Sequence, residues 1–221
     1  LDTPKAVGPL IATLKDNEPY VRSAGALALG RLGDSRALDP LVAALHDEKP
    51  SVRTDVIIAL GVLKDLRAVD GLLGALKDRF EVNRYKAAGA LSQMGPSVVV
   101  PLITALKDES PRVREGAALA LGMLRDDQTI DHLVATLRDD NSDVRRFAAW
   151  ATSQFGFTMV QPMITALEDE DRNMRESGVV ALGELGDPRA VQPLITAFEG
   201  SRVPRNEVVK ALGQLKDPRS I

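Results

Sequence analysis

The chain has 221 residues, of which 28 are Lys or Arg and 31 are Asp or Glu, so its net charge is -3. This near balance argues against a protein that binds nucleic acid through phosphate contacts. Cys is absent and His occurs only twice, which excludes disulfides, thiolate catalysis and Cys-ligated metals. The sequence has no apolar run of membrane length and no signal-peptide pattern, so we expect no membrane partner and favour a cytoplasmic over a secreted location.

One unit of sequence recurs seven times along the chain. The segment GPLIATLKD at 8–16 returns as PLITALKD at 101–108 and PMITALED at 162–169, and a block like VRSAGALALGRL at 21–32 follows every copy. The step is 31 residues, or 30 where one loop residue is missing. We place the repeats at about 3–33, 34–64, 65–95, 96–125, 126–156, 157–186 and 187–217, within a single domain over residues 1–217.

Each repeat is expected to form two helices. In the first copy, apolar residues follow the i, i+3, i+4, i+7 spacing of one buried stripe: Ala6, Val7, Leu10, Ile11 and Leu14. No segment alternates with period two over a useful length, so no sheet is expected. A pair of short helices cannot bury its own apolar faces, but stacked pairs form a continuous core. The predicted fold is therefore all-α, an α-solenoid of seven two-helix repeats of 30–31 residues.

The ends of the predicted second helices carry a helix-stop signal. A glycine, which readily adopts positive φ, follows four of them: Gly33, Gly95, Gly156 and Gly186. Lys64, Arg125 and Lys216 take this place in three other repeats. We expect these three helix ends to be less sharply capped.

The repeat pattern is similar to that of a known family. The consensus D-x-R-A-V-x-P-L-I-x-A-L-x-D…V-R-x-x-A-x-x-A-L-G-x-L-G-D resembles the HEAT-like repeats named after the phycobilisome lyases, over residues 1 to about 217. Ser92 and Ser153 depart from it where the pattern has Gly, and Thr152 departs where it has Leu. The resemblance implies that the second helices line the concave surface, and that the role is that of a scaffold, a lyase subunit or a hydroxylase.

Both ends of the sequence suggest a longer solenoid. The chain begins with Leu1 at a repeat boundary, and residues 218–221 open an eighth, truncated repeat. Neither terminal repeat has the polar outer face of a capping repeat. We therefore expect this chain to be part of a longer protein or to have been trimmed.

One column of the repeat is arginine without exception. It comprises Arg22, Arg53, Arg84, Arg114, Arg145, Arg175 and Arg205. Seven arginines in a row could bind a polyanion. We favour a structural ladder, because an Asp recurs just after the first helix of six repeats and can accept charge-assisted hydrogen bonds from Arg. Columns of Ala and Gly in the second helices are also expected to be structural, since they let neighbouring helices approach closely.

Function is expected where the columns vary. Second-helix positions outside the buried stripe lie 2, 3, 6 and 10 residues after its first residue, and several of them are apolar. An exposed apolar stripe usually marks an interaction surface, so we predict that a protein or peptide binds the concave face through Trp150, Phe147, Arg146, Leu119, Met123, Tyr85, Lys86, Ile58, Val62 and Val180. Two alternatives stay open. The aliphatic members could be rim packing, and the aromatic group of Phe147, Trp150, Phe155 and Phe157 could be local repacking around Thr152 and Gly156.

The sequence offers little for catalysis. His46 and His132 lie three repeats apart and neither precedes a Glu, whereas the hydroxylases that the resemblance points to hold iron with His-Glu pairs. There is no Gly-rich phosphate loop. We predict no catalytic residue, no metal, no cofactor and no nucleic-acid partner, and thus a non-catalytic scaffold. The alternative is a chromophore-lyase-like or hydroxylase-like subunit.

Overall fold

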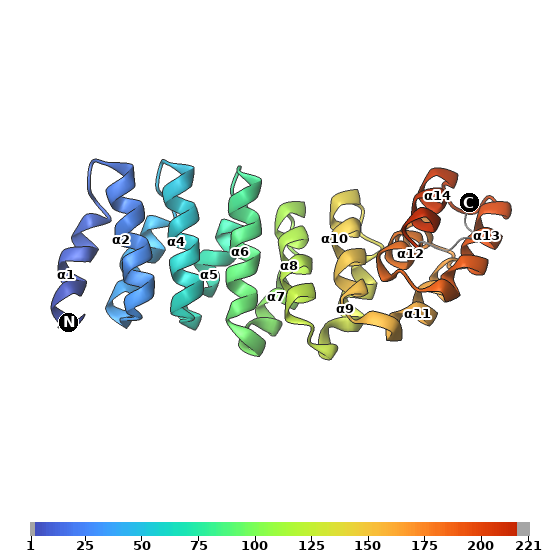
Figure 1. Ribbon diagram of the computed structural model, residues 1–221, viewed down its shortest axis with the longest axis horizontal. Helices are drawn as coiled ribbons and strands as arrows, with labels where there is room; N and C mark the ends of the chain where they lie inside the picture. Colours follow the sequence, from blue (N-terminus) through green and yellow to red (C-terminus); the bar gives the residue numbers. More distant parts are fainter. Residues whose placement is uncertain (1–2, 216–221) are drawn as a thin grey trace. The chain divides into compact units, whose positions relative to one another are not determined.

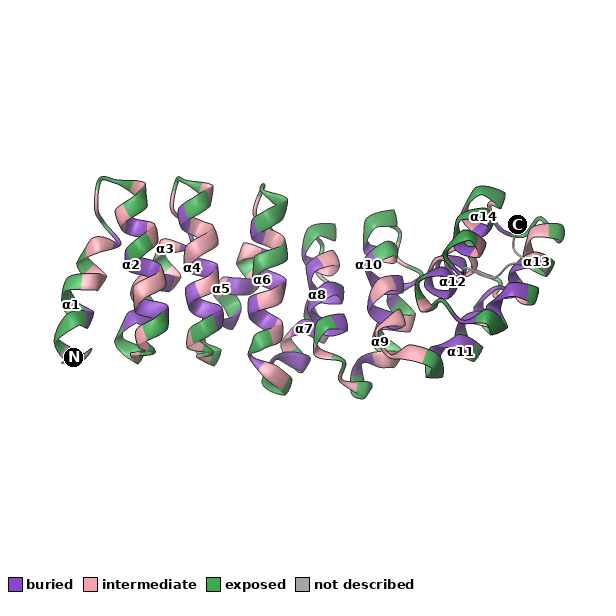
Figure 2. Ribbon diagram, in the orientation of Figure 1, coloured by how far each residue is buried: buried purple, intermediate pink, exposed green. Residues whose placement is uncertain are grey.

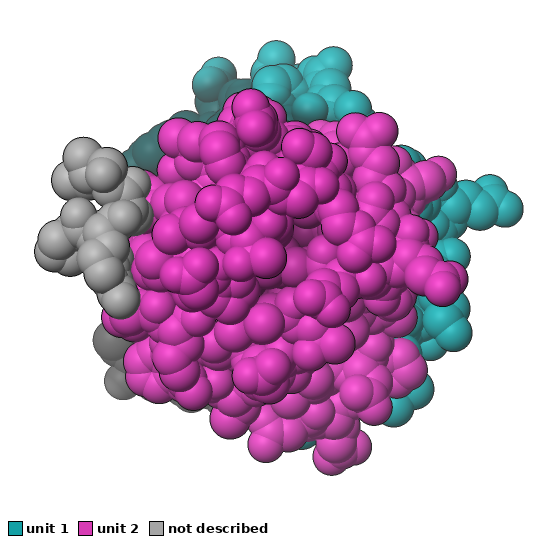
Figure 3. Space-filling model, turned by 90° about the vertical axis from the view of Figure 1, so that its right-hand side faces the viewer, with its two compact units in different colours: residues 1–120 teal, residues 121–221 magenta. Residues whose placement is uncertain are grey.

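The computed structural model describes residues 3–215 and confirms the all-α prediction, because these residues contain helices and no strand (Figure 1). Contacts divide the chain into two compact units, residues 1–120 and residues 121–221, which Figure 3 colours separately. The predicted eighth repeat, at residues 218–221, lies outside the described residues. That all seven repeats form a single domain stays a prediction.

Each repeat consists of a first helix and a second helix, as predicted. The odd-numbered helices are the first helices: α1 (Thr3–Thr13), α3 (Leu38–Ala44), α5 (Val69–Ala75), α7 (Val99–Ala105), α9 (Ile130–Thr136), α11 (Val160–Ala166) and α13 (Val191–Glu199). The even-numbered helices are the second helices: α2 (Pro19–Leu32), α4 (Pro50–Leu63), α6 (Glu81–Gln93), α8 (Pro111–Leu124), α10 (Ser142–Ser153), α12 (Arg172–Leu185) and α14 (Arg205–Gln214).

A short 3-10 turn precedes every first helix after α1, a feature that periodicity did not predict. The turns are η1 (Ser35–Ala37), η2 (Leu66–Ala68), η3 (Gly95–Val98), η4 (Asp127–Thr129), η5 (Gly156–Met159) and η6 (Pro188–Ala190). Four of them begin after an Asp whose side chain accepts a backbone N–H, as Asp187 does from Arg189 at 2.8 Å. Such a cap satisfies a donor that helix geometry leaves free.

The second helices pack directly on one another within each unit, which confirms the structural role of the Gly and Ala columns. In the first unit, a Cβ added to Gly30 would lie 2.7 Å from the Cα of Ala59. In the second unit, a Cβ added to Gly183 would lie 3.0 Å from the Cα of Ala211. Buried residues accordingly run along the second helices, while the loops are exposed (Figure 2).

Four second helices, α2, α4, α8 and α12, end in the same way, although glycine follows only two of them. Gly33 and Gly186 have positive φ as predicted, but so do Lys64 and Arg125, both at 54°. The Lys64 N–H donates to the Leu60 carbonyl at 3.1 Å, and Arg125 makes the equivalent bond to Leu121. The expectation of less sharply capped ends at these two residues is therefore wrong, because both adopt the left-handed conformation and make the same closing hydrogen bond as the glycines do. Lys216 lies outside the described residues.

Replacing Lys64 by glycine should raise the free energy of unfolding by up to about 1 kcal/mol, because a left-handed residue with a Cβ is strained and glycine is not. Urea denaturation of wild type and Lys64→Gly measures the difference. The reverse change, Gly33→Lys, places a side chain at φ 69° in open space and should destabilise. Equal stability of both variants with wild type would mean that this backbone strain is negligible.

Candidate interaction surface

The predicted binding residues separate into exposed, half-buried and buried groups. In the first unit, Val62 and Tyr85 are exposed by 50% and 38%, Lys86 is exposed, and Ile58 is half-buried. In the second unit, Met123 is 43% exposed, Arg146 is exposed, and Trp150 and Val180 are half-buried. We call the exposed and half-buried members in the second unit, Met123, Arg146, Trp150 and Val180, the second-helix surface.

Phe147 and Leu119 do not belong to this surface, and their prediction as exposed binding residues is wrong. Their exposed fractions are only 8% and 6%. Ser177 is the equivalent of Phe147 in the next repeat. It is buried too, and its hydroxyl donates to the Leu137 carbonyl at 2.8 Å. The Arg146 guanidinium lies 5.3 Å from the centroid of the Phe147 ring. Phe147 is thus a core residue beside the surface.

The other aromatic residues of this repeat have different environments. Phe155 is half-buried and packs against the core of the second unit, whereas Phe157 is 69% exposed on the turn η5. Thr152, which takes the place of a leucine, is buried and donates its hydroxyl to the Ala148 carbonyl at 2.8 Å. The burial of Phe147 and the packing of Phe155 fit the local-repacking alternative for these two residues, whereas Trp150 is half-buried and Phe157 is largely exposed.

Trp150 lies against α8, above the backbone of Gly122. A Cβ added to Gly122 would lie 2.8 Å from Cζ3 of the indole and 2.7 Å from the Cα of Ala151. Glycine at this position therefore leaves room for the indole ring of Trp150 to pack on the α8 backbone. The indole is half-buried, and Met123, one residue after Gly122, is exposed.

A pocket opens on the second-helix surface between α10, α12 and α14. Its volume is about 310 Å³, and its lining residues are Ser142, Arg145, Arg146, Glu176, Ser177, Val180, Glu184, Glu207 and Lys210. Val180 supplies an apolar patch among charges of both signs. Two of these charges have partners outside the pocket, since Arg146 pairs with Asp143 at 3.1 Å and Glu176 with Arg172 at 2.7 Å. The pocket is thus amphipathic, with a small apolar patch inside a charged rim.

The arginine column forms the predicted ladder between the first three repeats. Nε and Nη2 of Arg22 donate to Asp47 at 2.6 and 2.9 Å, and the same atoms of Arg53 donate to Asp78 at 2.6 and 3.0 Å. Nη1 of Arg53 also donates to the Asp47 carbonyl at 2.7 Å. These arginines join neighbouring repeats and hold the end of the preceding loop, a geometry that supports the structural interpretation over polyanion binding.

The ladder is not uniform, contrary to the prediction. In every repeat from the first to the sixth, Nη1 of the arginine donates to the backbone of the preceding loop, as Arg114 does to the Asp108 carbonyl at 3.0 Å, but the partners of the other nitrogens differ. In the sixth repeat, where Gly200 replaces the next aspartate, Nε of Arg175 donates to the Arg202 carbonyl instead. In the seventh, Arg205 lies over the Phe198 ring, 4.6 Å from its centroid.

The Arg53–Asp78 pair should make stability depend on acid pH. Burial acts to raise the pKa of Asp78, but hydrogen bonds from Arg53, the Phe80 N–H and Asn83 outweigh it and lower the pKa from 3.8 to about 2. Because the folded-state pKa lies below the ordinary value, this contribution is complete above pH 3.8 and is lost as the pH falls through about 2.

We expect the loss to be about 2 kcal/mol between pH 5 and pH 2, relative to an Asp78→Asn variant. Urea titrations of both proteins at several pH values give the difference in the free energy of unfolding. Parallel pH profiles for the two proteins would show that Asp78 does not titrate in this way.

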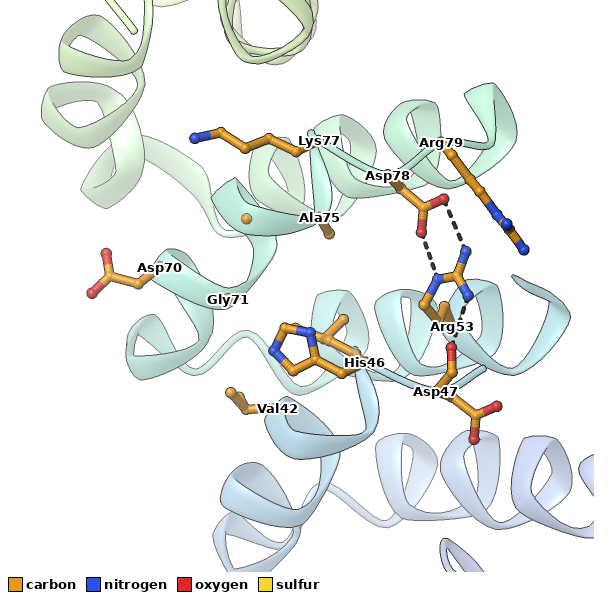
Figure 4. Close-up of a pocket in the computed structure, with 12 residues that line it drawn as sticks. Val42, His46, Asp47, Arg53, Asp70, Gly71, Ala75, Lys77, Asp78 and Arg79 are labelled. Atoms are coloured by element: carbon orange, nitrogen blue, oxygen red, sulfur yellow. Dashed lines mark hydrogen bonds and ion pairs between the residues drawn. The ribbon is translucent and has the colours of Figure 1, made fainter. Parts of the chain in front are cut away.

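A larger pocket lies on the first-helix side of the first unit, between α3 and α5 (Figure 4). Its volume is about 540 Å³, and Figure 4 shows His46 near Gly71 and the Arg53–Asp78 pair at one side. Sequence reasoning missed this pocket. The available signal was Gly74, which stands where the other repeats have Ala or Thr and where an added Cβ would meet nothing within 4 Å.

The two histidines contribute to no metal site in the part of the chain that the structure describes. His46 and His132 are both exposed. Within residues 3–215, no group of three or more His, Cys, Asp or Glu side chains could hold a metal ion. None of the helices in this range combines the length and apolar character needed to cross a membrane.

The stacked helix pairs and the Gly–Ala contacts between second helices define an α-helical repeat protein of the solenoid class. A sequence profile for HEAT repeats matches three overlapping stretches, residues 5–92, 69–153 and 130–213. Together these stretches cover most of the chain, which therefore belongs to the HEAT repeat family.

Several solved structures resemble this chain, whereas no curated protein matches it. The chain is similar to the complex of CpcE and CpcF of phycocyanin lyase from Nostoc sp. PCC7120, with 25% identity, a TM-score of 0.48 and coverage of 93% of this chain and 85% of that chain. For the Escherichia coli protein YibA the values are 23%, 0.48, 96% and 82%. For human deoxyhypusine hydroxylase in complex with glycerol they are 22%, 0.42, 96% and 84%.

Proposed function

We propose that this HEAT repeat protein is a non-catalytic scaffold that binds a protein segment on its second-helix surface. The observation that carries the proposal is the amphipathic pocket between α10, α12 and α14, together with the half-buried Trp150 one helical turn after the pocket residue Arg146 on α10. Binding sites for side chains combine an apolar patch with a few polar groups, as Val180 and its charged rim do here.

The kinds of side chain on this surface fit a protein partner. Trp and Arg are enriched among the residues that contribute most to binding at protein interfaces, and Met adapts to partners of different shape. Trp150 already packs against Gly122, so its side chain would lose little conformational entropy when a partner covers the exposed part of the indole. An extended or helical segment laid across α10 and α12 would contact Arg146, Trp150 and Val180 together.

Selection of peptides from a random display library tests the proposal, with the purified protein as the target. The selected peptides should lose about 30-fold in affinity, equivalent to about 2 kcal/mol, on Trp150→Ala or Val180→Asp. Phe157→Ala is the matched control, because Phe157 is an exposed aromatic residue of the same unit on the turn η5. Peptides that bind both surface variants as well as they bind wild type would contradict the proposed site.

The chromophore-lyase-like or hydroxylase-like alternative predicts a different result. Protein purified from its native host would then carry a bound tetrapyrrole or stoichiometric iron. Absorbance spectra and metal analysis of that material distinguish this alternative from a scaffold.

A further inference from the structure

Two of the six 3-10 turns that the structure describes in residues 3–215 lack the side-chain cap found at the other four. Asp34, Asp65, Asp126 and Asp187 cap the turns η1, η2, η4 and η6 with their side chains. The turns η3 and η5 have no such aspartate, and no side chain caps them. They read Gly95-Pro96-Ser97-Val98 and Gly156-Phe157-Thr158-Met159. These turns lie in the two 30-residue steps, so the missing residue is the capping aspartate.

The arginine ladder changes at the same two junctions. Each inter-repeat pair described above joins an Arg and an Asp that are 25 residues apart, whereas the shorter step places Arg84 and Asp108 only 24 apart. Within residues 3–215, Arg84 makes no ion pair, and Asp108 pairs with Lys77 at 3.6 Å instead. The same change occurs at the junction between the fifth and sixth repeats. There Asp169 pairs with Arg138, at 2.6 Å, and not with Arg145.

The shift leaves a buried donor unsatisfied at the junction between the third and fourth repeats. Nε of Arg84 is buried and has no hydrogen-bond partner among the described residues, while Nη1 donates to the Asp78 carbonyl at 3.1 Å. A buried donor without a partner is penalised relative to the same donor in water. Separation of the two repeats would hydrate this Nε, so opening is easier here than at a junction closed by a buried Arg–Asp pair.

We propose that the junctions after the third and fifth repeats are built-in opening points, at which neighbouring repeats separate before they separate elsewhere. Three features coincide there: the 30-residue step, the uncapped 3-10 turn and the displaced ion pair. The junction between the second and third repeats is the matched reference, because its turn is capped by Asp65 and its arginine pairs with Asp78. Opening points of this kind would let the scaffold adjust to a partner without unfolding a repeat.

The absence of native cysteine allows a direct test by thiol labelling. Ala90 of the third repeat and Ala120 of the fourth repeat occupy the same column. Both are buried, with exposed fractions of 3% and 0%. In single-cysteine proteins, Ala120→Cys reports on the third-to-fourth junction and Ala90→Cys on the second-to-third. After normalisation to global stability, a thiol reagent should label Ala120→Cys about tenfold faster, the factor that one unsatisfied donor implies. Equal labelling rates would overturn the proposal.

A one-residue insertion provides the converse test. Insertion of Asp between Gly95 and Pro96 recreates the Gly-Asp-Pro sequence that residues 186–188 already contain, and restores the 31-residue step. It should slow the labelling of Ala120→Cys to the rate of Ala90→Cys. An unchanged rate in the inserted protein would contradict a role of the step length.

Hydrogen exchange of the wild-type protein keeps the proposal testable if a cysteine variant does not fold. Backbone amides of residues 95–99 should exchange about tenfold faster than those of residues 65–69, and the Asp insertion should remove the difference. Equal exchange in the two turns would overturn the proposal.

Discussion

Replacing Arg53 by alanine should lower the free energy of unfolding by about 3–5 kcal/mol, because it leaves the buried Asp78 carboxylate without its charged partner. The side chains of the pair are only 12% and 7% exposed. The substitution also removes the donor to the Asp47 carbonyl. Asp78 would keep the Phe80 N–H and Asn83 as donors, which limits the loss.

Urea denaturation of Arg53→Ala measures this loss, and Arg36→Ala is the control. Arg36 pairs with Asp34 at a similar distance, 2.8 Å, but is 57% exposed, so solvent screens the pair and its removal should cost far less than that of Arg53. Asp78→Asn in the Arg53→Ala background should recover part of the stability, since no charge is then left unpaired. Equal effects of the Arg53 and Arg36 substitutions would refute the structural role of the ladder.

Replacing Gly30 by valine should cost about 3 kcal/mol, at the upper end of what overpacking usually costs, because the new side chain meets backbone rather than flexible atoms. Its Cβ would lie 2.7 Å from the Cα and 3.0 Å from the carbonyl oxygen of Ala59. The helices α2 and α4 would therefore have to move apart along their whole contact.

Gly89→Ala is the matched control for this substitution. Gly89 also lies inside a second helix of the first unit, but a Cβ there meets nothing within 4 Å. Alanine favours helix by about 1 kcal/mol over glycine, so this change should stabilise. Thermal or urea denaturation of the two variants separates close packing from helix propensity, and a Gly30→Val protein as stable as wild type would contradict the close packing of α2 on α4.

Repetition made the architecture predictable from the sequence. Seven copies of one pattern fix the helix pairs, and a residue present in every copy, such as Arg53 or Ala59, indicates a contact that stacking requires. The same reasoning failed where a single repeat differs. Arg84 shares its column with Arg53, yet one missing residue in the following turn displaces its partner. The column alone does not show this change, whereas the repeat length does.

The interaction surface was less predictable, for a geometric reason. One position of the repeat lies three residues after the first residue of the buried stripe. Whether its side chain is exposed depends on how the second helix is rotated about its own axis. Lys86 is exposed at this position, whereas Phe147 and Ser177 are buried at the same position. Helical periodicity defines a stripe only to within about one residue on either side, and it cannot resolve this boundary.

The fluorescence of Trp150, the only tryptophan, tests the proposed surface most directly. The half-buried indole should be quenched by acrylamide in the free protein, and a selected peptide should protect it. Trp150→Ala should also cost less than the roughly 3–5 kcal/mol of a core aromatic, since part of the ring is already exposed. Blue-shifted emission that acrylamide cannot quench in the free protein, or quenching unchanged by bound peptide, would contradict a binding site on the second-helix surface.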